Sequence, residues 1–127
     1  MKIILDTNFL MAIAQFRIDI FSEIGRIAEF RYDICILDKT IDELNNIIKV
    51  QKGKERFAAK LALDILDAKG ISQLKTGPGK TDDLIVDAAG KDTVIATQDR
   101  ELKRRVCRKG AKVIGIRQKR YLFLKDA

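Results

Sequence analysis

Four acidic side chains of this chain stand where they could act on one substrate, namely Asp6, Glu43, Asp82 and Asp99. Asp6 directly follows an apolar run, residues 2–5, that is typical of a fully buried strand. Asp99 lies just beyond a second such run, residues 93–96, at the point where a helix is expected to begin. Ligands of open α/β sheets bind outside the carboxyl ends of the strands, so both acids are candidates for a site. Each could equally cap a helix, because aspartate is a common N-cap residue.

Helical geometry separates the other two acids from their neighbours. At about 100° per residue, Asp82 lies roughly 65–70° from the centre of the apolar side of helix 82–90. Asp83 points almost directly away from that centre, so we prefer Asp82 as the inward-facing acid. Glu43 lies roughly 95° from the apolar centre of helix 39–50, at the border of its inner face. Both acids are therefore expected to be half-buried at the starts of helices, although a first-turn acid also satisfies the helix dipole.

Carboxylates gathered in one cleft repel one another, and without cations their pKa values should rise. Hard divalent ions relieve that repulsion, and oxygen ligands suit Mg²⁺ or Mn²⁺. One or two such ions could activate a water molecule and stabilise the charge on a phosphodiester during in-line displacement. The chain has no histidine, which excludes Ser-His triads, Cys-His pairs and the usual zinc sites. The acids therefore predict metal-dependent chemistry on a phosphodiester.

The elements that must position these acids alternate along the chain. Apolar runs predict strands at 2–5, 33–37, 71–75, 93–96 and 112–116. Helical patterns cover 9–30, with a break near 17–19, and then 39–50, 54–69, 81–90 and 99–109. Such alternation implies a three-layer α/β/α sandwich around a central, mainly parallel five-stranded sheet. The length predicts a single domain over residues 1–127.

The net charge of +7 is concentrated towards the carboxyl end. Residues 99–127 carry 11 basic and 3 acidic side chains, whereas the rest of the chain is close to neutral. This basic C-terminal region, 99–125, favours a polyanionic partner such as RNA. By helical position Arg100 and Arg104 are the best candidates for RNA contact, and Lys80, in the loop before helix 81–90, could touch a phosphate.

The remaining features concern compartment and association. Cys35 and Cys107 lie in or beside apolar stretches and are expected to be reduced packing residues. No apolar run approaches the roughly 20 residues that a membrane span needs, and the first residues give too short an apolar stretch for a signal peptide. We therefore expect a cytoplasmic location without membrane contact. Residues 121–124 are expected to form either an edge strand or a patch for homodimer contact.

The four acids lie in four segments that resemble the motifs of PIN-domain nucleases. In chain order these are Leu5-Asp6-Thr7-Asn8-Phe9-Leu10, Ile41-Asp42-Glu43-Leu44, Thr81-Asp82-Asp83-Leu84-Ile85 and Ala96-Thr97-Gln98-Asp99-Arg100-Glu101-Leu102. Each motif is weak alone, but together they cover nearly the whole chain in the right order. The resemblance implies an α/β/α sandwich, two divalent ions and endonucleolytic cleavage of RNA that leaves a 5′-phosphate.

The resemblance also implies roles for single residues. Asp6, Glu43, Asp82 and Asp99 match the acidic quartet of the family, which would act in catalysis and in metal binding. By motif alone either Asp82 or Asp83 could fill the third position, so Asp83 is at least a supporting residue. Asn8 and Thr97 match positions that support the site through hydrogen bonds.

Two subgroups of the family come into question. The basic stretch 97–105, followed by 117–119, is similar to PIN nucleases that mature small-subunit ribosomal RNA. The VapC toxins of toxin–antitoxin pairs share the acidic quartet but less often this basic stretch. We favour the ribosomal-RNA-processing subgroup, which implies a ribosome-assembly partner, whereas a toxin would imply a protein inhibitor.

Three other readings compete with a ribonuclease. Residues 77–81 superficially resemble a P-loop, but the pattern needs a glycine where Leu74 stands. A non-catalytic RNA-binding protein on a degenerate PIN scaffold is disfavoured because all four acids are present. It is also disfavoured because the eight aromatic residues, mostly at core-like spacing, indicate no interleaved basic–aromatic surface. A DNA nuclease remains an alternative, since nothing in the sequence reads a 2′-hydroxyl.

Overall fold

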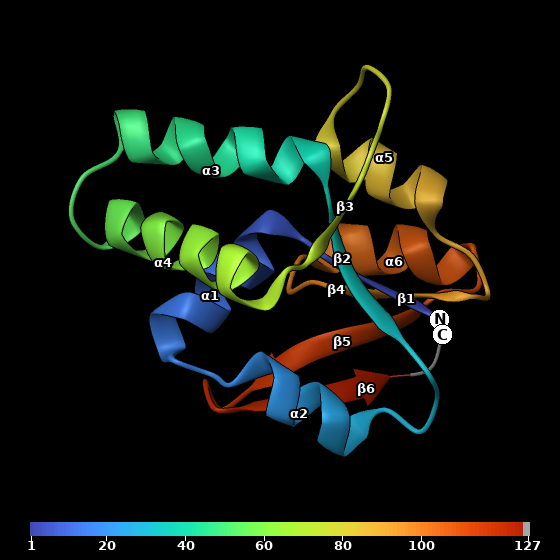
Figure 1. The fold of residues 1–127 in the computed structure, drawn as a ribbon. Helices are drawn as coiled ribbons and strands as arrows, with labels where there is room; N and C mark the ends of the chain where they lie inside the picture. Colours follow the sequence, from blue (N-terminus) through green and yellow to red (C-terminus); the bar gives the residue numbers. More distant parts are fainter. Residues whose placement is uncertain (126–127) are drawn as a thin grey trace.

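The computed structural model describes residues 1–125 and, within them, one six-stranded sheet with the strand order β3-β2-β1-β4-β5-β6 (Figure 1). The strands are β1 Lys2–Leu5, β2 Asp33–Leu37, β3 Ser72–Leu74, β4 Thr93–Ala96, β5 Lys112–Arg117 and β6 Tyr121–Lys125. All neighbouring strands pair in parallel except β5 and β6, which are antiparallel. The predicted mainly parallel sheet is thus confirmed, with one strand more than expected.

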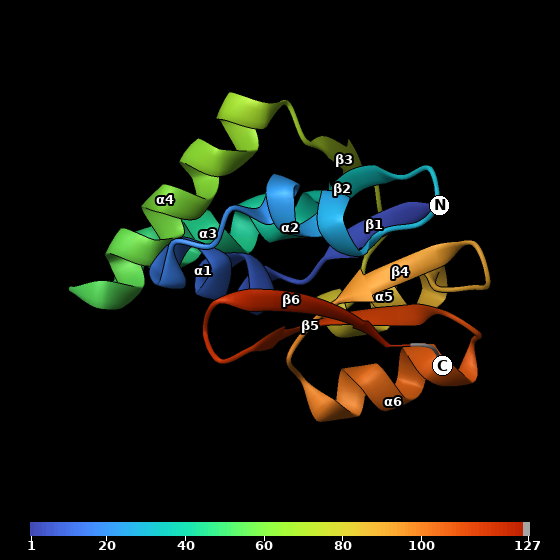
Figure 2. The same ribbon diagram turned by 90° about the horizontal axis from the view of Figure 1, so that it is seen from below.

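The helices cover both faces of this sheet and complete the predicted three-layer sandwich. They are α1 Thr7–Phe16, α2 Ile20–Ile27, α3 Asp38–Val50, α4 Lys54–Lys69, α5 Thr81–Ala88 and α6 Arg100–Arg108. The first four lie on one face, and α6 lies on the opposite face together with α5 (Figure 2). The expected interruption near 17–19 is present, because Arg17 adopts a left-handed conformation that ends α1 and Asp19 caps α2.

Alternating side chains of the strands separate the core into two halves. Ile3 and Leu5 of β1 pack towards α1–α4, whereas Ile4 between them packs towards α5 and α6. Every one of these side chains is fully buried, as expected for strands of a parallel sheet that is covered on both faces. Burying a single side chain of this size contributes about 1.5–3 kcal/mol, so the two half-cores hold the strand ends in fixed positions.

The order in which the chain adds strands to the sheet reverses beside β1. From β1 it proceeds outwards through β2 to β3, and then crosses back through α5 to enter β4 on the other side of β1. This makes β1 and β4 neighbours at the topological switch point, where α/β sheets bind ligands. Leu5 is in register with Ala96, and the backbone N–H of Asp6 donates to the carbonyl of Ala96 at 3.0 Å. The residues that follow these two strands are thereby placed side by side.

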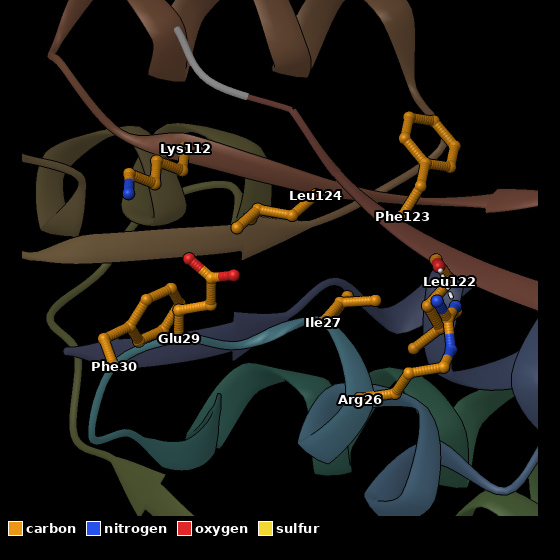
Figure 3. A pocket seen from close by; sticks show the side chains of 8 residues that line it. All are labelled: Arg26, Ile27, Glu29, Phe30, Lys112, Leu122, Phe123 and Leu124. Carbon is orange, nitrogen blue, oxygen red and sulfur yellow. Dashed lines mark hydrogen bonds between the residues drawn. The ribbon is translucent and has the colours of Figure 1, made fainter.

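The tail at 121–124 forms the edge strand β6, which is one of the two structures expected for it. Leu122 is buried and Phe123 and Leu124 are partly buried, while Tyr121 remains 42% exposed. The outer edge of β6 is occupied at Leu122, whose N–H donates to Glu23 Oε1 at 2.9 Å and whose carbonyl accepts from Arg26 Nη2 at 2.8 Å. Figure 3 shows the hydrogen bond between Arg26 and Leu122 in the pocket between α2 and β6. The large apolar side chains that are most exposed lie elsewhere, at Val50 and Phe57.

The structure also bears on the two cysteines and on the expectation that no segment spans a membrane. Cys35 and Cys107 are both free thiols, as expected for packing residues. Cys35 is buried in strand β2, and Cys107 is partly buried on α6. None of the helices within residues 1–125 combines the length and the apolar character that crossing a bilayer requires.

Candidate active site

Asp6 and Thr97 form the buried centre of the candidate site. Asp6 is only 6% exposed, and Thr97, at the end of β4, is fully buried. Thr97 Oγ1 donates to Asp6 Oδ2 at 2.9 Å and accepts from the backbone N–H of Asp99 at 3.1 Å. One hydroxyl group therefore fixes the Asp6 carboxylate relative to the start of α6, across the junction of β1 and β4.

The electrostatics of Asp6 show which charges face it. Its pKa is raised to about 6, first by burial of the carboxyl group and then by the negative charges of Asp82 and Glu43. The hydrogen bond from Thr97 acts in the opposite direction, because it stabilises the ionised form. Asp6 is thus a buried acid that Asp82 and Glu43 approach closely enough to disfavour its ionisation.

Glu43, on α3, is held by the residue that follows Asp6. Thr7 Oγ1 donates to Glu43 Oε1 at 2.7 Å and is 3.1 Å from Thr40 Oγ1 in a second hydrogen bond. Thr7 and Thr40 are both buried, so the hydrogen bond between them joins α1 to α3 away from solvent. The sequence motif contains Thr7 but did not single it out. The available signal was a small hydroxyl side chain in the first turn of a helix that directly follows a buried strand.

Asp82 and Asp83 differ in their partners although they are adjacent on α5. The pKa of Asp82 is raised by loss of water around its carboxyl group and then by the charges of Asp99 and Glu43, against a lowering effect of Arg105. Asp83 instead accepts from Arg105 Nη2 at 2.7 Å in an ion pair that joins α5 to α6. Asp82 is therefore the member of the pair that faces the other acids. Arg105, which the sequence did not single out, lies beside both.

The exposure of Glu43 and Asp82 differs from the prediction, and the capping role of Asp99 is one that the sequence allowed. Glu43 and Asp82 are exposed rather than half-buried. The angular position on a helix gives the direction of a side chain relative to that helix's own apolar face, but not whether another element covers it. Asp99 does cap α6, as the alternative reading allowed, because its Oδ1 accepts from the backbone N–H of Leu102 at 3.0 Å.

The donor chemistry of the site suits a hard divalent cation. Within residues 1–125, no protein donor reaches the carboxylate of Asp82 or the second oxygens of Glu43 and Asp99. Carboxylate oxygens that repel one another and lack donors are ligands for Mg²⁺ or Mn²⁺. As the side chains stand, no three Asp, Glu or Cys residues in this part of the chain form a group that could hold an ion. Binding an ion would therefore require the acids to come closer together than they stand.

The other predicted residues lie around the site with fewer contacts. Asn8 is exposed, and its side chain makes no hydrogen bond with the described residues 1–125. Lys80 is exposed at the N-cap of α5, directly before the Thr81-Asp82 pair. Arg100 is exposed on the first turn of α6, and Arg104 forms an exposed ion pair with Glu101. The structure thus adds Thr7 and Arg105 to the neighbourhood of the acids and gives Asn8 no evident supporting contact.

Comparison with known proteins gives the class to which this fold and these acids belong. Residues 3–119 match the family model described as a PIN-like domain. The chain is 32% identical over 124 residues to Ribonuclease VapC4 of Methanocaldococcus jannaschii, an alignment that covers 94% of this chain and 93% of the relative. It is 26% identical over 123 residues to Ribonuclease VapC9 of Archaeoglobus fulgidus, covering 95% of this chain and 87% of the relative.

A solved structure agrees at the level of the fold. The PIN domain endonuclease Utp24 superposes with a TM-score of 0.77 at 23% identity, covering 99% of this chain and 92% of that chain. The chain belongs to the PIN-like domain family, and the resemblance seen in the four sequence segments is confirmed.

Proposed function

We propose that this protein is an endoribonuclease that hydrolyses RNA phosphodiester bonds with the help of Mg²⁺ or Mn²⁺. The observation that carries the proposal is the buried Asp6 at the β1–β4 junction, whose pKa is raised by burial and by Asp82 and Glu43. Keeping an ionised carboxylate in that setting is unfavourable for the metal-free protein, and a bound cation is the simplest compensation. Two full-length relatives that carry the name ribonuclease support the choice of RNA as substrate.

The roles of the residues follow from their positions. One or two divalent ions would be held by the acidic quartet, namely Asp6, Glu43, Asp82 and Asp99. Such an ion supplies a polarised water and charge stabilisation at the phosphate. Thr97 and Thr7 hold Asp6 and Glu43 by the hydrogen bonds described above. Arg100, which follows Asp99, and Lys80, two positions before Asp82, are both exposed and are the proposed contacts to the flanking phosphates.

The biological setting has two candidates. The basic stretch on α6 and after β5 favours processing of ribosomal or other structured RNA, with a ribosome-assembly partner. The names of the relatives VapC4 and VapC9 favour a toxin of a toxin–antitoxin pair, which would be held inactive by a protein inhibitor. A cytoplasmic location fits both settings. If the protein forms a homodimer, the exposed Val50 and Phe57 are better candidates for its contact than the tail, which is used as a strand.

Cleavage of total RNA in the presence of Mn²⁺ or Mg²⁺, followed by mapping of the new ends, tests the activity directly. We expect endonucleolytic products with 5′-phosphates, complete loss of cleavage in EDTA, and recovery when excess divalent ion is restored. A discrete set of sites in ribosomal RNA would support a processing role. Cleavage that persists in EDTA would rule out the metal-dependent mechanism.

Replacing Thr97 by valine is expected to weaken divalent-ion binding about 10–100-fold, the range typical when a hydrogen bond that orients a metal ligand is lost. Valine keeps the shape of this fully buried side chain but removes the hydroxyl that holds Asp6 and accepts from the N–H of Asp99. Titration of Mn²⁺ followed by thermal unfolding measures the affinity. Thr97→Ser, which keeps the hydroxyl group, is the matched control and should bind ions nearly as the wild type does. Equal weakening by both variants would show that packing, rather than the hydrogen bond, is what matters.

A further inference from the structure

A cavity of about 610 Å³ lies between α6 and the β5–β6 hairpin, and none of the four acids of the candidate site lines it. In Figure 2 the helix α6 lies directly below the β5–β6 hairpin. Four of its lining side chains are cationic, and none is acidic, the cations being Lys103, Arg104, Arg117 and Lys125. Arg104 is paired with Glu101, but within residues 1–125 no carboxylate pairs with the other three. The cavity therefore concentrates positive charge that the described residues leave uncompensated.

An aromatic ring and a guanidinium group are already stacked in this cavity. The Arg117 guanidinium carbon lies 4.5 Å from the centroid of the Phe123 ring. Phe123 is the cross-strand partner of Gly115, and a side chain at Gly115 would come within 2.7 Å of the ring. The ring thus lies against the bare backbone of β5, with the cation beside it. This corrects the sequence-based expectation that no basic–aromatic surface exists, because spacing along the chain does not reveal cross-strand pairs.

Hydrogen bonds of Gln98 connect the strand β5, which lines this cavity, to the start of α6, where Asp99 lies. Gln98, next to Asp99, bonds both backbone groups of Ile116, accepting from its N–H at 2.8 Å and donating to its carbonyl at 3.4 Å. Arg117 follows Ile116 at the end of β5, and β5 runs parallel to β4. The end of the cavity that contains Arg117 is therefore at the carboxyl ends of β4 and β5, as Asp99 is. Lys125 is paired with Val113 and lies towards the amino end of β5.

We propose that this cavity binds the single-stranded RNA that flanks the cleaved phosphodiester. Lys103, Arg117 and Lys125 would contact successive phosphates, and one unpaired base would stack on the Arg117–Phe123 pair. Bases stack on aromatic rings and on guanidinium planes without strong sequence preference, and lysine and arginine supply the salt-dependent part of the affinity. The inference rests on the proposed function for its substrate, but it concerns binding and can be tested without cleavage. An acidic protein segment is the competing occupant.

Binding of a fluorescein-labelled 12-nucleotide oligouridine, measured by anisotropy in EDTA, tests the phosphate contacts. We expect the double variant Arg117→Ala/Lys125→Ala to bind roughly tenfold or more weakly and to show a shallower dependence on salt, by about 0.7 per lost contact. The matched control is Arg56→Ala/Lys60→Ala, which removes the same charges from exposed positions of α4 on the opposite face of the sheet. It should bind as the wild type does. Equal weakening by both variants, or none by either, overturns the proposal.

The stacking step has a spectroscopic test, because the chain contains no tryptophan. In Phe123→Trp the new indole is the only one, and oligouridine should quench its fluorescence with the same midpoint as the anisotropy titration. Phe123→Leu, which keeps an apolar side chain over Gly115, should lower the affinity about tenfold, as expected for loss of one stacked base. Unchanged indole fluorescence with full RNA binding would place the strand elsewhere. Quenching of the indole by polyglutamate but not by oligouridine would identify an acidic protein segment as the occupant and overturn the proposal.

Failure of this inference and failure of the proposed function are distinguishable. A protein that cleaves RNA with Mn²⁺ but whose affinity is insensitive to Arg117 and Lys125 retains the function and loses the binding cavity. A protein that binds RNA through these residues in EDTA but never cleaves it with Mn²⁺ retains the cavity and loses the nuclease.

Discussion

Replacing Asp6 by asparagine is expected to stabilise the metal-free protein and, at the same time, to abolish RNA cleavage. The two effects have one cause. The pKa of Asp6 is raised to about 6 from its ordinary value of 3.8, mainly because the carboxyl group is buried and then because Asp82 and Glu43 repel its charge. Asparagine has nearly the same shape, can still accept from Thr97 and carries no charge to bury. It can no longer give a metal ion a negatively charged ligand.

The sign of the pH dependence follows from proton binding. Between about pH 4 and pH 6 the folded protein binds a proton at Asp6 that the unfolded chain has already released, so stability falls as the pH rises through this window. Above pH 6 the loss is complete and amounts to roughly 3 kcal/mol. Asp6→Asn lacks this loss, so the two proteins should differ little near pH 3.5 and most at neutral pH.

Thermal unfolding in EDTA and in Mn²⁺, at several pH values, measures these effects. In EDTA at pH 7.5 the variant should melt roughly 10–15 °C higher than the wild type. Added Mn²⁺ should stabilise the wild type by mass action and leave the variant unchanged. Asp42→Asn makes the same chemical change at an exposed position of α3 and should alter neither the stability nor the cleavage. A variant that is less stable in EDTA than the wild type, or that still cleaves RNA, would contradict the role of Asp6.

The sequence predicts the framework of the site because that framework depends on local patterns. Buried runs such as residues 2–5 and 93–96 define strands, and alternation with helices requires parallel pairing. The residues that directly follow neighbouring parallel strands must then meet at the carboxyl ends of those strands, as Asp6 and Thr97 do. The sequence does not decide whether residues 121–124 form a strand, because the pairing of this segment depends on the turn at 118–120. There Gln118 and Lys119 adopt positive φ values of 56° without the glycine or asparagine that usually marks such turns.

Other features of the site depend on contacts between distant segments, which no local pattern contains. Asp38 stands at the carboxyl end of β2, much as Asp6 does at β1, yet its carboxylate accepts from Thr76 Oγ1 and from the Thr76 backbone N–H. These bonds lower its pKa and join the end of β2 to the loop after β3, a structural task. Position at a strand end therefore does not by itself distinguish an acid that holds the fold from one that serves the site. What distinguishes Asp38 is that hydrogen-bond donors engage both of its carboxylate oxygens.

The same criterion separates Asp82 from Asp83 and leads to the second large effect. Asp82→Asn is expected to reduce RNA cleavage about 1,000-fold, since loss of a charged ligand costs several kcal/mol of transition-state stabilisation. Asp83→Asn should retain activity within about threefold. Its carboxylate is engaged by Arg105, and an exposed ion pair of this kind contributes only about 0–1 kcal/mol to stability.

The two substitutions form a matched pair, because they remove the same charge from adjacent positions in the first turn of α5. Any general effect on the helix, on the net charge or on non-specific RNA binding is therefore common to both. Single-turnover cleavage with saturating Mn²⁺ gives the rate, and Mn²⁺ titration by thermal unfolding gives the affinity of the ion. Asp82→Asn should lower both, whereas Asp83→Asn should lower neither. The reverse result would make Asp83 the third acid and would mean that Arg105 exchanges partners when the ion binds. Equal loss in both variants would instead show that the α5 turn acts as a unit, with the Asp83–Arg105 pair holding Asp82 in place.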